Sequence, residues 1–442
     1  MKTRAMLAPL AAVLLAGAAL APAHAATDLL QAWQLARRAD PALAAADANR
    51  RAIDEGVVQA RAPLLPQLGA SAGWNQQTSG ALDPDGRLRT RDVSLNLSQT
   101  LVDVGAVARL GAARSLSDAQ AAAYLAAEQD LCVRVASAYL DALSAADELA
   151  IAQANEDAYR RQAEQAESRY RSGLSAQVDV EQARAYHANA RGRTIDARTA
   201  LADAREALAE ITGAPVDELK PLRAELALAA PQPDDASAWV AMALAQNPAL
   251  AVQSRTVDAA QRTIDAQRAG HLPTLSAGLG VGRSTQWPSG GAIDPGPLNG
   301  RSVTSVGLTL NIPLYSGGAV DSRVRQAAAQ RDAARDDLEA RRRRLARDTL
   351  EQFRGVHAGI GQIEAARLAV ASAAKALEST RVGLELGTQT MTDLLLAIQT
   401  QSAALEAQSQ ARHRYLVARL RLAQSAGAIG ESDLASVNAM LD

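Results

Sequence analysis

The sequence predicts a mostly α-helical chain with a membrane β-barrel portion, in which very long antiparallel helices are joined to four short strands. Three observations predict this fold class. The chain aligns with itself at a shift of roughly 210 residues, so we expect an internal duplication. Spans of about 70 residues contain no proline, and segments of about ten residues alternate between apolar and polar side chains.

The segment 1–25 is expected to be a cleaved signal peptide. Lys2 and Arg4 precede an apolar stretch over 5–20, and Ala23-His24-Ala25 follows as a cleavage pattern of small residues. The alternative is a membrane anchor, but the stretch is shorter than the ~20 residues that a spanning helix needs. No later apolar run reaches that length, so we expect no transmembrane helix in the mature chain.

The composition indicates narrow interfaces between helices rather than a thick globular core. Aromatic residues make up 3% of the 442 residues, and Ala is abundant throughout, which suits helices that approach closely through small side chains. The net charge of −2 gives no reason to expect a nucleic-acid partner. The basic run at 341–344 is interpreted as a solvated helix face, with a charged partner as the alternative. The single cysteine, Cys132, excludes an internal disulfide and is expected to be buried in a helix.

The duplication divides the chain into five segments. Four pairs of positions anchor it: Asp40-Pro41 with Asn247-Pro248, Leu65-Pro66 with Leu272-Pro273, Gly173 with Gly387, and Asp179 with Asp393. We therefore expect the signal peptide at 1–25, a first repeat at 26–212, a linker at 213–235, a second repeat at 236–428 and a C-terminal tail at 429–442.

Each repeat has the same predicted order of helix, β-hairpin, long helix and returning helix. In the first repeat, a helix is expected over 28–62, and alternating strands follow at 67–74 and 93–98 around an Asp-Pro-Asp-Gly turn at 83–86. The second repeat alternates at 275–281 and 306–312, and the Gly-, Pro- and Ser-rich stretch at about 283–303 is expected to be a loop. Such alternation is typical of membrane strands, although strands of a soluble sandwich alternate as well.

The proline-free spans favour the membrane interpretation. They run from 103 to about 172 and from about 320 to 386, and a helix of about 70 residues would be ~105 Å long, which no compact domain accommodates. Returning helices are expected at 176–212 and 390–426. The helices at 28–62 and 176–212 together match the long one in length, so they can stack end to end beside it in a uniform helical wall.

The four strands predict an assembly of several chains. Their sheet would have open edges, and a bilayer does not tolerate unpaired backbone groups, so the sheet must close. Because the smallest membrane barrels need roughly eight strands, several copies must contribute to one barrel.

Two turn motifs and the duplicated order of elements resemble the TolC-type outer membrane efflux proteins, the outer membrane channels of tripartite efflux and type I secretion systems. The motifs are GLSAQVDVEQAR at 173–184 and GTQTMTDLLLA at 387–397, and the second repeat opens with a family-like segment from Ala245 to Leu250. The resemblance covers essentially the whole mature chain.

The resemblance implies a homotrimer with a shared twelve-stranded β-barrel in the outer membrane of a Gram-negative cell and an α-helical barrel in the periplasm. Such a channel is a passive exit duct for small molecules or unfolded proteins. Its partners would be outer membrane lipid, a periplasmic adaptor (membrane fusion) protein and an inner-membrane transporter of ABC, RND or MFS type. The alternative is a periplasmic coiled-coil structural or adaptor protein, which would lack the paired alternating strands.

The resemblance also implies which residues form the periplasmic aperture. Asp393 matches a position of its acidic ring, and Asp179 matches an acidic residue that helps to hold the entrance closed. An aspartate that only stabilises the start of its helix is the alternative. Gln389 and Leu384 stand where relatives carry an arginine and a tyrosine that tie neighbouring coils together, and Leu396 replaces a second acidic ring position.

Two turns correspond to the family's docking sites for adaptor hairpins. They are centred on Gly173-Leu174 and Gly387-Thr388, and their glycines also suit ordinary helix C-caps. Trp74 and Trp287 are candidate lipid-interface anchors at the loop ends of strands, with ordinary packing as the alternative.

No enzyme is expected. The sequence contains no nucleophile elbow, phosphate loop or dinucleotide fingerprint. The histidines at 187, 271, 357 and 413 are scattered, so neither a cofactor nor a metal site is predicted.

Overall fold

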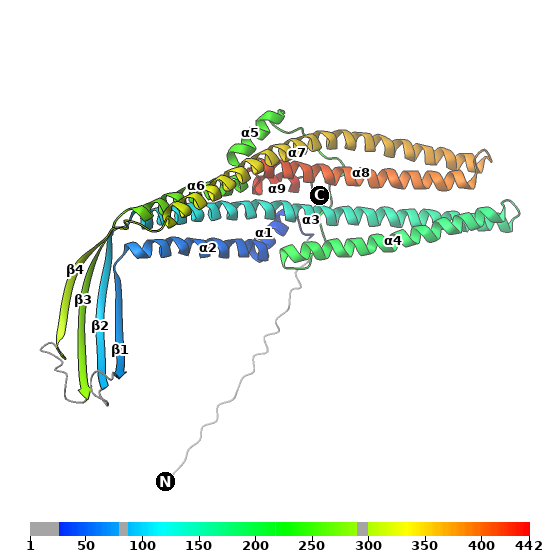
Figure 1. Ribbon diagram of the computed structural model, residues 1–442. Helices are drawn as coiled ribbons and strands as arrows, with labels where there is room; N and C mark the ends of the chain where they lie inside the picture. Colours follow the sequence, from blue (N-terminus) through cyan, green and yellow to red (C-terminus); the bar gives the residue numbers. More distant parts are fainter. Residues whose placement is uncertain (1–25, 79–86, 217, 290–298) are drawn as a thin grey trace, which may run out of the picture.

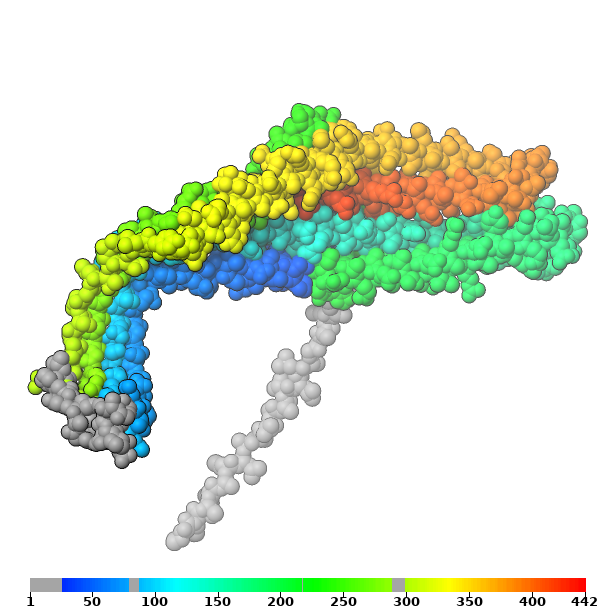
Figure 2. Space-filling model, viewed as in Figure 1, coloured from blue at the N-terminus to red at the C-terminus, as the bar shows by residue number. Residues whose placement is uncertain are grey.

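The computed structural model describes residues 26–78, 87–216, 218–289 and 299–442. The expected signal peptide and the Asp-Pro-Asp-Gly turn lie outside these ranges. Two continuous helices, α3 (Val104–Arg171) and α7 (Ala319–Glu385), run along a rod, and a four-stranded sheet projects from one end of it at an angle (Figures 1 and 2). Their 68 and 67 residues confirm the predicted long helices and correspond to ~100 Å of helix at ~1.5 Å per residue.

Shorter helices complete the wall on both long ones. Helix α4 (Gln177–Thr212) packs against one half of α3 and α2 (Pro41–Arg61) against the other half (Figure 1). In the second repeat, α8 (Met391–Ser425) and α6 (Pro248–Arg268) pack against α7 in the same way. The predicted end-to-end arrangement is therefore present. Among the described helices, none combines the length and the apolarity needed to cross a bilayer.

The prediction of a single helix over 28–62 is wrong, because the chain breaks at Asp40. The structure has α1 (Leu29–Ala39) and then α2, and Asp40 between them has an extended ψ of 117°. The Asp40 carboxylate accepts a hydrogen bond of 2.8 Å from the Leu43 backbone N–H, and Pro41 occupies the first position of the new helix. The second repeat breaks in the same way at Asn247, between α5 (Ala236–Gln246) and α6.

The sheet is antiparallel, with its strands in chain order. The strands are β1 (Gln67–Thr78), β2 (Arg87–Val102), β3 (Thr274–Ser289) and β4 (Ser302–Asn311). The predicted loop at 283–303 is wrong over 283–289, because β2 extends to Arg87 and its backbone pairs with β3 as far as Ser289. It is also wrong at 302–303, where β4 begins and pairs with β3. The side chain of Asn299 strengthens this end through hydrogen bonds of 2.7 and 3.0 Å to the backbone of Gln286.

The two faces of the sheet differ in polarity, as the alternation predicts. Cross-strand partners point to the same face, and Leu95 lies opposite both Ala70 and Val281. The apolar face continues through exposed side chains on all four strands: Leu68, Val93, Leu279, Val306, Leu308 and Leu310. On the other face, the hydroxyls of Ser71 and Ser94 are 2.9 Å apart, and small polar residues and glycines predominate.

Two hydrophobic clusters hold the rod together. The belt core lies at mid-rod, where α1, α3, α8 and α9 (Glu431–Asn438) meet, and includes Leu29, Tyr139, Leu143, Tyr415, Leu434 and Leu441. The C-terminal tail is thus part of this core. Cys132 also lies in the belt core, as predicted, and burial raises the pKa of its thiol. The tip core lies at the end of the rod away from the sheet and includes Tyr159, Val180, Leu377, Met391, Leu394, Leu395 and Ile398.

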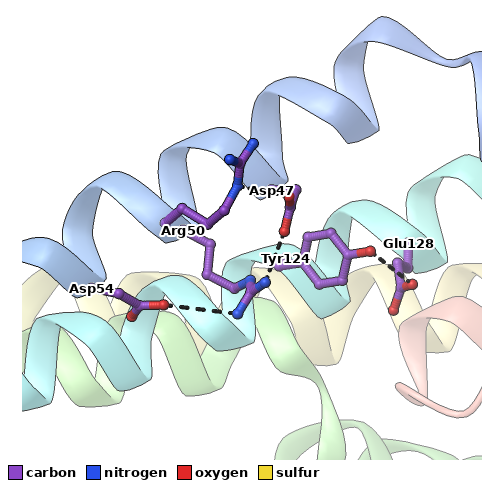
Figure 3. Close-up of polar contacts among 6 residues, drawn as sticks. Asp47, Arg50, Asp54, Tyr124 and Glu128 are labelled. Carbon is purple, nitrogen blue, oxygen red and sulfur yellow. Dashed lines mark hydrogen bonds and ion pairs between the residues drawn. The ribbon is translucent and has the colours of Figure 1, made fainter.

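Leu43 is the one buried residue of α2, and a cation–π contact further along the helix also joins α2 to α3. Arg50 lies between the carboxylates of Asp47, at 2.8 Å, and Asp54, at 3.8 Å (Figure 3). Its guanidinium carbon is 5.5 Å from the ring centre of Tyr124 on α3, which is within cation–π range. The Tyr124 hydroxyl in turn donates a hydrogen bond of 3.2 Å to Glu128.

Candidate functional site

The predicted aperture and docking residues lie at the tip of the rod, in the turns of two helical hairpins (Figure 1). We call α3 with α4 the first helical hairpin and α7 with α8 the second. In the first turn, Gly173 has a φ of +73°, which favours glycine over residues with a Cβ atom. Its N–H donates to the Tyr170 carbonyl at 2.9 Å, and the Leu174 N–H donates to the Arg169 carbonyl at 2.8 Å. These bonds satisfy carbonyl groups at the end of α3, as the expected glycine C-cap requires.

The second turn has the same backbone form. Gly387 has a φ of +75°, and the Thr388 N–H donates to the Gly383 carbonyl at 2.8 Å. The Gln389 N–H donates to the same carbonyl at 3.1 Å. A Cβ atom at Gly383 would lie 2.5 Å from the Gln389 Cγ, so the exposed Gln389 folds back over α7.

Asp393 lies in the first turn of α8 and forms a reciprocal hydrogen-bond pair with Thr390, the residue that precedes the helix. Its carboxylate accepts from the Thr390 hydroxyl at 2.6 Å and from the Thr390 N–H at 2.9 Å, while its own N–H donates to the Thr390 hydroxyl oxygen at 3.2 Å. The side-chain and backbone hydrogen bonds from Thr390 lower the pKa of Asp393 below its usual value of 3.8. The carboxylate therefore stays charged throughout the neutral range.

Asp179 has the corresponding place at the start of α4. Its carboxylate accepts from the Ser175 hydroxyl at 2.7 Å and from the Ala176 N–H at 3.3 Å. Because Ala176 has no side-chain acceptor, this capping is one-sided. Each aspartate thus performs the local role of a helix-start acid, and within one chain each remains in its own turn.

Two contacts that the sequence did not predict join the two helical hairpins at the tip. The buried Tyr159 hydroxyl of α3 donates to the Leu395 carbonyl of α8 at 3.1 Å, and burial raises the pKa of Tyr159 to about 12. The Thr392 hydroxyl of α8 lies 2.9 Å from the Gln182 Oε1 of α4 and donates to it. We call these the tip ties. Gln182 and Thr392 lie within the two turn motifs. Tyr159 could have been singled out only as one of the few aromatic residues, which make up 3% of the chain.

The turns also expose large apolar side chains. Leu174 in the first turn is 71% exposed, and Leu386 beside Gly387 is 75% exposed. Leu384 packs against the tip core, whereas Leu396 is exposed. A tip that ends in exposed leucines has the apolar surface that a docking partner could cover.

Trp74 and Trp287 lie at the opposite end of the molecule, toward the loop ends of β1 and β3. They are 64% and 49% exposed. Trp74 is the cross-strand partner of Arg91, and Trp287 is the partner of Arg89, so both tryptophans project from the apolar face of the sheet.

Comparisons with known proteins agree with this architecture. A family model described as outer membrane efflux protein matches residues 32–214 and 239–428. The outer membrane protein TolC of Escherichia coli strain K12 is 32% identical over 422 residues, which cover 93% of this chain and 85% of that protein. The proteases secretion protein PrtF of Dickeya chrysanthemi is 30% identical over 428 residues, covering 92% of this chain and 90% of that protein. A membrane protein from Pseudomonas aeruginosa of known crystal structure has a TM-score of 0.80 at 20% identity, with 91% of each chain covered.

Proposed function

This chain belongs to the outer membrane efflux protein family, and from this membership we propose that three copies of it form a passive exit duct across the outer membrane and periplasm. The chain is an outer membrane channel protein with the family's β-barrel and α-helical barrel fold. The number of copies, the partners and the cargo are the parts that we propose.

The observation that carries the proposal is the sheet with one exposed apolar face and two open edges. Within the described strands, β1 pairs with β2 alone and β4 pairs with β3 alone. A lipid environment requires these edges to be paired, and β4 of one copy can pair with β1 of the next. Three copies then supply twelve strands, with the apolar face toward lipid and the small polar residues toward the lumen.

The rods continue this assembly into the periplasm. Helix α8 of the second helical hairpin packs against α3 and α4 of the first, and nearer the sheet α6 packs against α3. Three copies therefore provide a closed wall around one tunnel (Figure 1). The tip turns then meet at the tunnel entrance. Three copies of Asp393 concentrate negative charge there, and a cation held between them would obstruct the opening. Asp179 and Gln389 lie in the adjacent turns of the same aperture.

The tip ties support a closed resting state. They hold the second helical hairpin against the first through Tyr159–Leu395 and Gln182–Thr392. In this chain they substitute for the arginine and tyrosine ties that Gln389 and Leu384 replace. Opening requires the hairpins to separate at these contacts.

An adaptor protein docks at the turns around Gly173-Leu174 and Gly387-Thr388. The exposed Leu174 and Leu386 supply apolar surface for it. An inner-membrane transporter of ABC, RND or MFS type delivers small molecules or unfolded proteins, and the similarity to a proteases secretion protein supports protein export among these cargoes. The duct itself catalyses no reaction.

Membrane extraction followed by electrophoresis tests the proposal. We expect the full-length chain in the outer membrane fraction, as a species of three chains that migrates faster before heating than its mass predicts. Purified protein should form conducting channels in planar bilayers. A periplasmic, monomeric protein without conductance would instead favour the coiled-coil adaptor alternative and contradict the proposal.

A further inference from the structure

The apolar face of the sheet changes character toward the loop ends of its strands. Arg87, Arg89 and Arg91 of β2 and Arg283 of β3 project from this same face, because they alternate in register with Val93 and Val281. All four side chains are exposed. We call Arg89, Arg91 and Arg283, together with Trp74 and Trp287, the basic girdle.

Among the residues of the four described strands, none on the face of the girdle is acidic. Asp92 is the one acidic residue of these strands, and it alternates to the opposite face of β2. Arg89 donates a hydrogen bond of 3.3 Å to the neutral side chain of Gln76. In the described ranges, Arg89, Arg91 and Arg283 form no ion pair with a carboxylate. The described strands therefore gather positive charge at this end of the face.

The depth of the girdle matches a bilayer interface. From Leu275 to Arg283, β3 covers ~27 Å at ~3.4 Å per residue, which is ~20 Å of bilayer depth at a strand tilt of ~40–45°. The apolar band of such barrels is ~25 Å tall. For a band that begins at Leu275, Arg283 thus lies ~5 Å inside the outer edge. Arg91, opposite Thr285, lies at the edge, and Arg89, opposite Trp287, lies beyond it. The cost of an arginine facing lipid falls steeply toward this edge.

We propose that the basic girdle binds the phosphate groups of anionic phosphorylated lipids in the outer leaflet. This inference rests on the proposed placement of the barrel in the outer membrane. Arginine forms paired, charge-assisted hydrogen bonds with phosphate, and tryptophan favours the headgroup level, so the girdle offers both kinds of contact. The loop ends lie across the sheet from the periplasmic rod, which places the girdle in the outer leaflet (Figure 1).

Native mass spectrometry of the purified full-length trimer tests this proposal. Trimers in detergent are incubated with lipid A, a bisphosphorylated glucosamine lipid, or with phosphatidylcholine. Each arginine near a lipid surface strengthens anionic binding about five-fold, so the variant Arg89→Gln/Arg91→Gln/Arg283→Gln should bind lipid A on the order of 100-fold more weakly. Phosphatidylcholine retention should not change. The matched control Arg342→Gln/Arg343→Gln/Arg344→Gln removes the same charge from exposed positions on α7 and should bind as the wild type does.

The outcomes separate this inference from the proposed function. The variant Arg89→Lys/Arg91→Lys/Arg283→Lys preserves charge and should retain most lipid A binding, which shows that the sheet tolerates substitution. Equal retention of lipid A by the glutamine variant and the wild type would overturn the inference. A wild-type trimer that conducts but retains lipid A no better than phosphatidylcholine would also overturn it, while leaving the exit duct intact. A protein that neither assembles nor conducts contradicts both.

Discussion

Removing the Tyr159 hydroxyl is expected to favour the open entrance. The substitution Tyr159→Phe keeps the buried ring in the tip core and deletes the hydrogen bond of 3.1 Å to the Leu395 carbonyl. Leu395 lies within α8, so its carbonyl still accepts a bond from the helix and is not left without a partner. The perturbation is therefore confined to the contact between the two helical hairpins.

The expected magnitude follows from the proposed assembly of three copies. One neutral hydrogen bond contributes ~1 kcal/mol net, so three symmetric copies contribute ~3 kcal/mol to a concerted closed state. Because each ~1.4 kcal/mol is a tenfold change in an equilibrium constant, the ratio of open to closed channels should rise on the order of 100-fold. Single-channel recording in planar bilayers measures this ratio as open probability and conductance.

A second tyrosine provides a matched control. The Tyr124 hydroxyl donates to Glu128 within α3 itself, so Tyr124→Phe removes a comparable bond without touching the contact between the hairpins (Figure 3). Its conductance should match that of the wild type. The reasoning is refuted if Tyr159→Phe trimers remain as closed as the wild type, or if Tyr124→Phe opens the channel equally.

Three further predictions concern the charge, the belt and the turns. Asp393→Ala should reduce block by multivalent cations in planar bilayers at neutral pH, where hydrogen bonds from Thr390, which lower the pKa of Asp393, keep the wild-type carboxylate charged. Asp40→Ala should lower the free energy of unfolding by ~2–4 kcal/mol in denaturant titrations, because it removes both a helix N-cap and the partner of Arg134 at 2.8 Å. Leu174→Asp should reduce cross-linking of the adaptor to the tip while leaving conductance unchanged, since the side chain is exposed.

Each of these predictions has an opposing result. Unchanged cation block in the Asp393 variant would remove that residue from the aperture ring. The hydrogen bond from Arg134 lowers the pKa of Asp40, so its contribution to stability is complete above the unfolded value near 3.8 and is lost as the pH falls through the lower folded value. A difference in stability between the wild type and Asp40→Ala that already shrinks well above pH 4 would contradict this assignment for Asp40. Undiminished cross-linking of the Leu174 variant would place the adaptor elsewhere.

The long helices and the strand alternation could be predicted from sequence because both depend on local patterns. The absence of proline from 103 to 172 predicted α3 to within one or two residues, and the apolar positions of β2 and β3 lie on one face as expected. The break at Asp40-Pro41 also had a local signal, since the same step recurs at Asn247-Pro248. A capping aspartate before a proline favours a new helix over continuation of the old one.

The remaining features depend on contacts between distant segments. The extension of β3 to Ser289 follows from pairing with β2, which overrides the loop-like composition of that stretch. Tyr159 and Leu395 are far apart in the sequence, so no local pattern could pair them. Asp179 and Asp393 were located correctly at helix starts, but the hydrogen bonds to Ser175 and Thr390 became visible only in the structure.

The separation of the belt core from the tip core turns the distal part of each rod into a lever. From Leu143, in the belt core, to Ser172, at the end of α3, the helix extends ~45 Å at ~1.5 Å per residue. Pivoting by about ten degrees at mid-rod therefore displaces the tip by ~8 Å. A small rotation of the distal helices about the belt core can thus widen the tunnel entrance without moving the half of the rod next to the sheet.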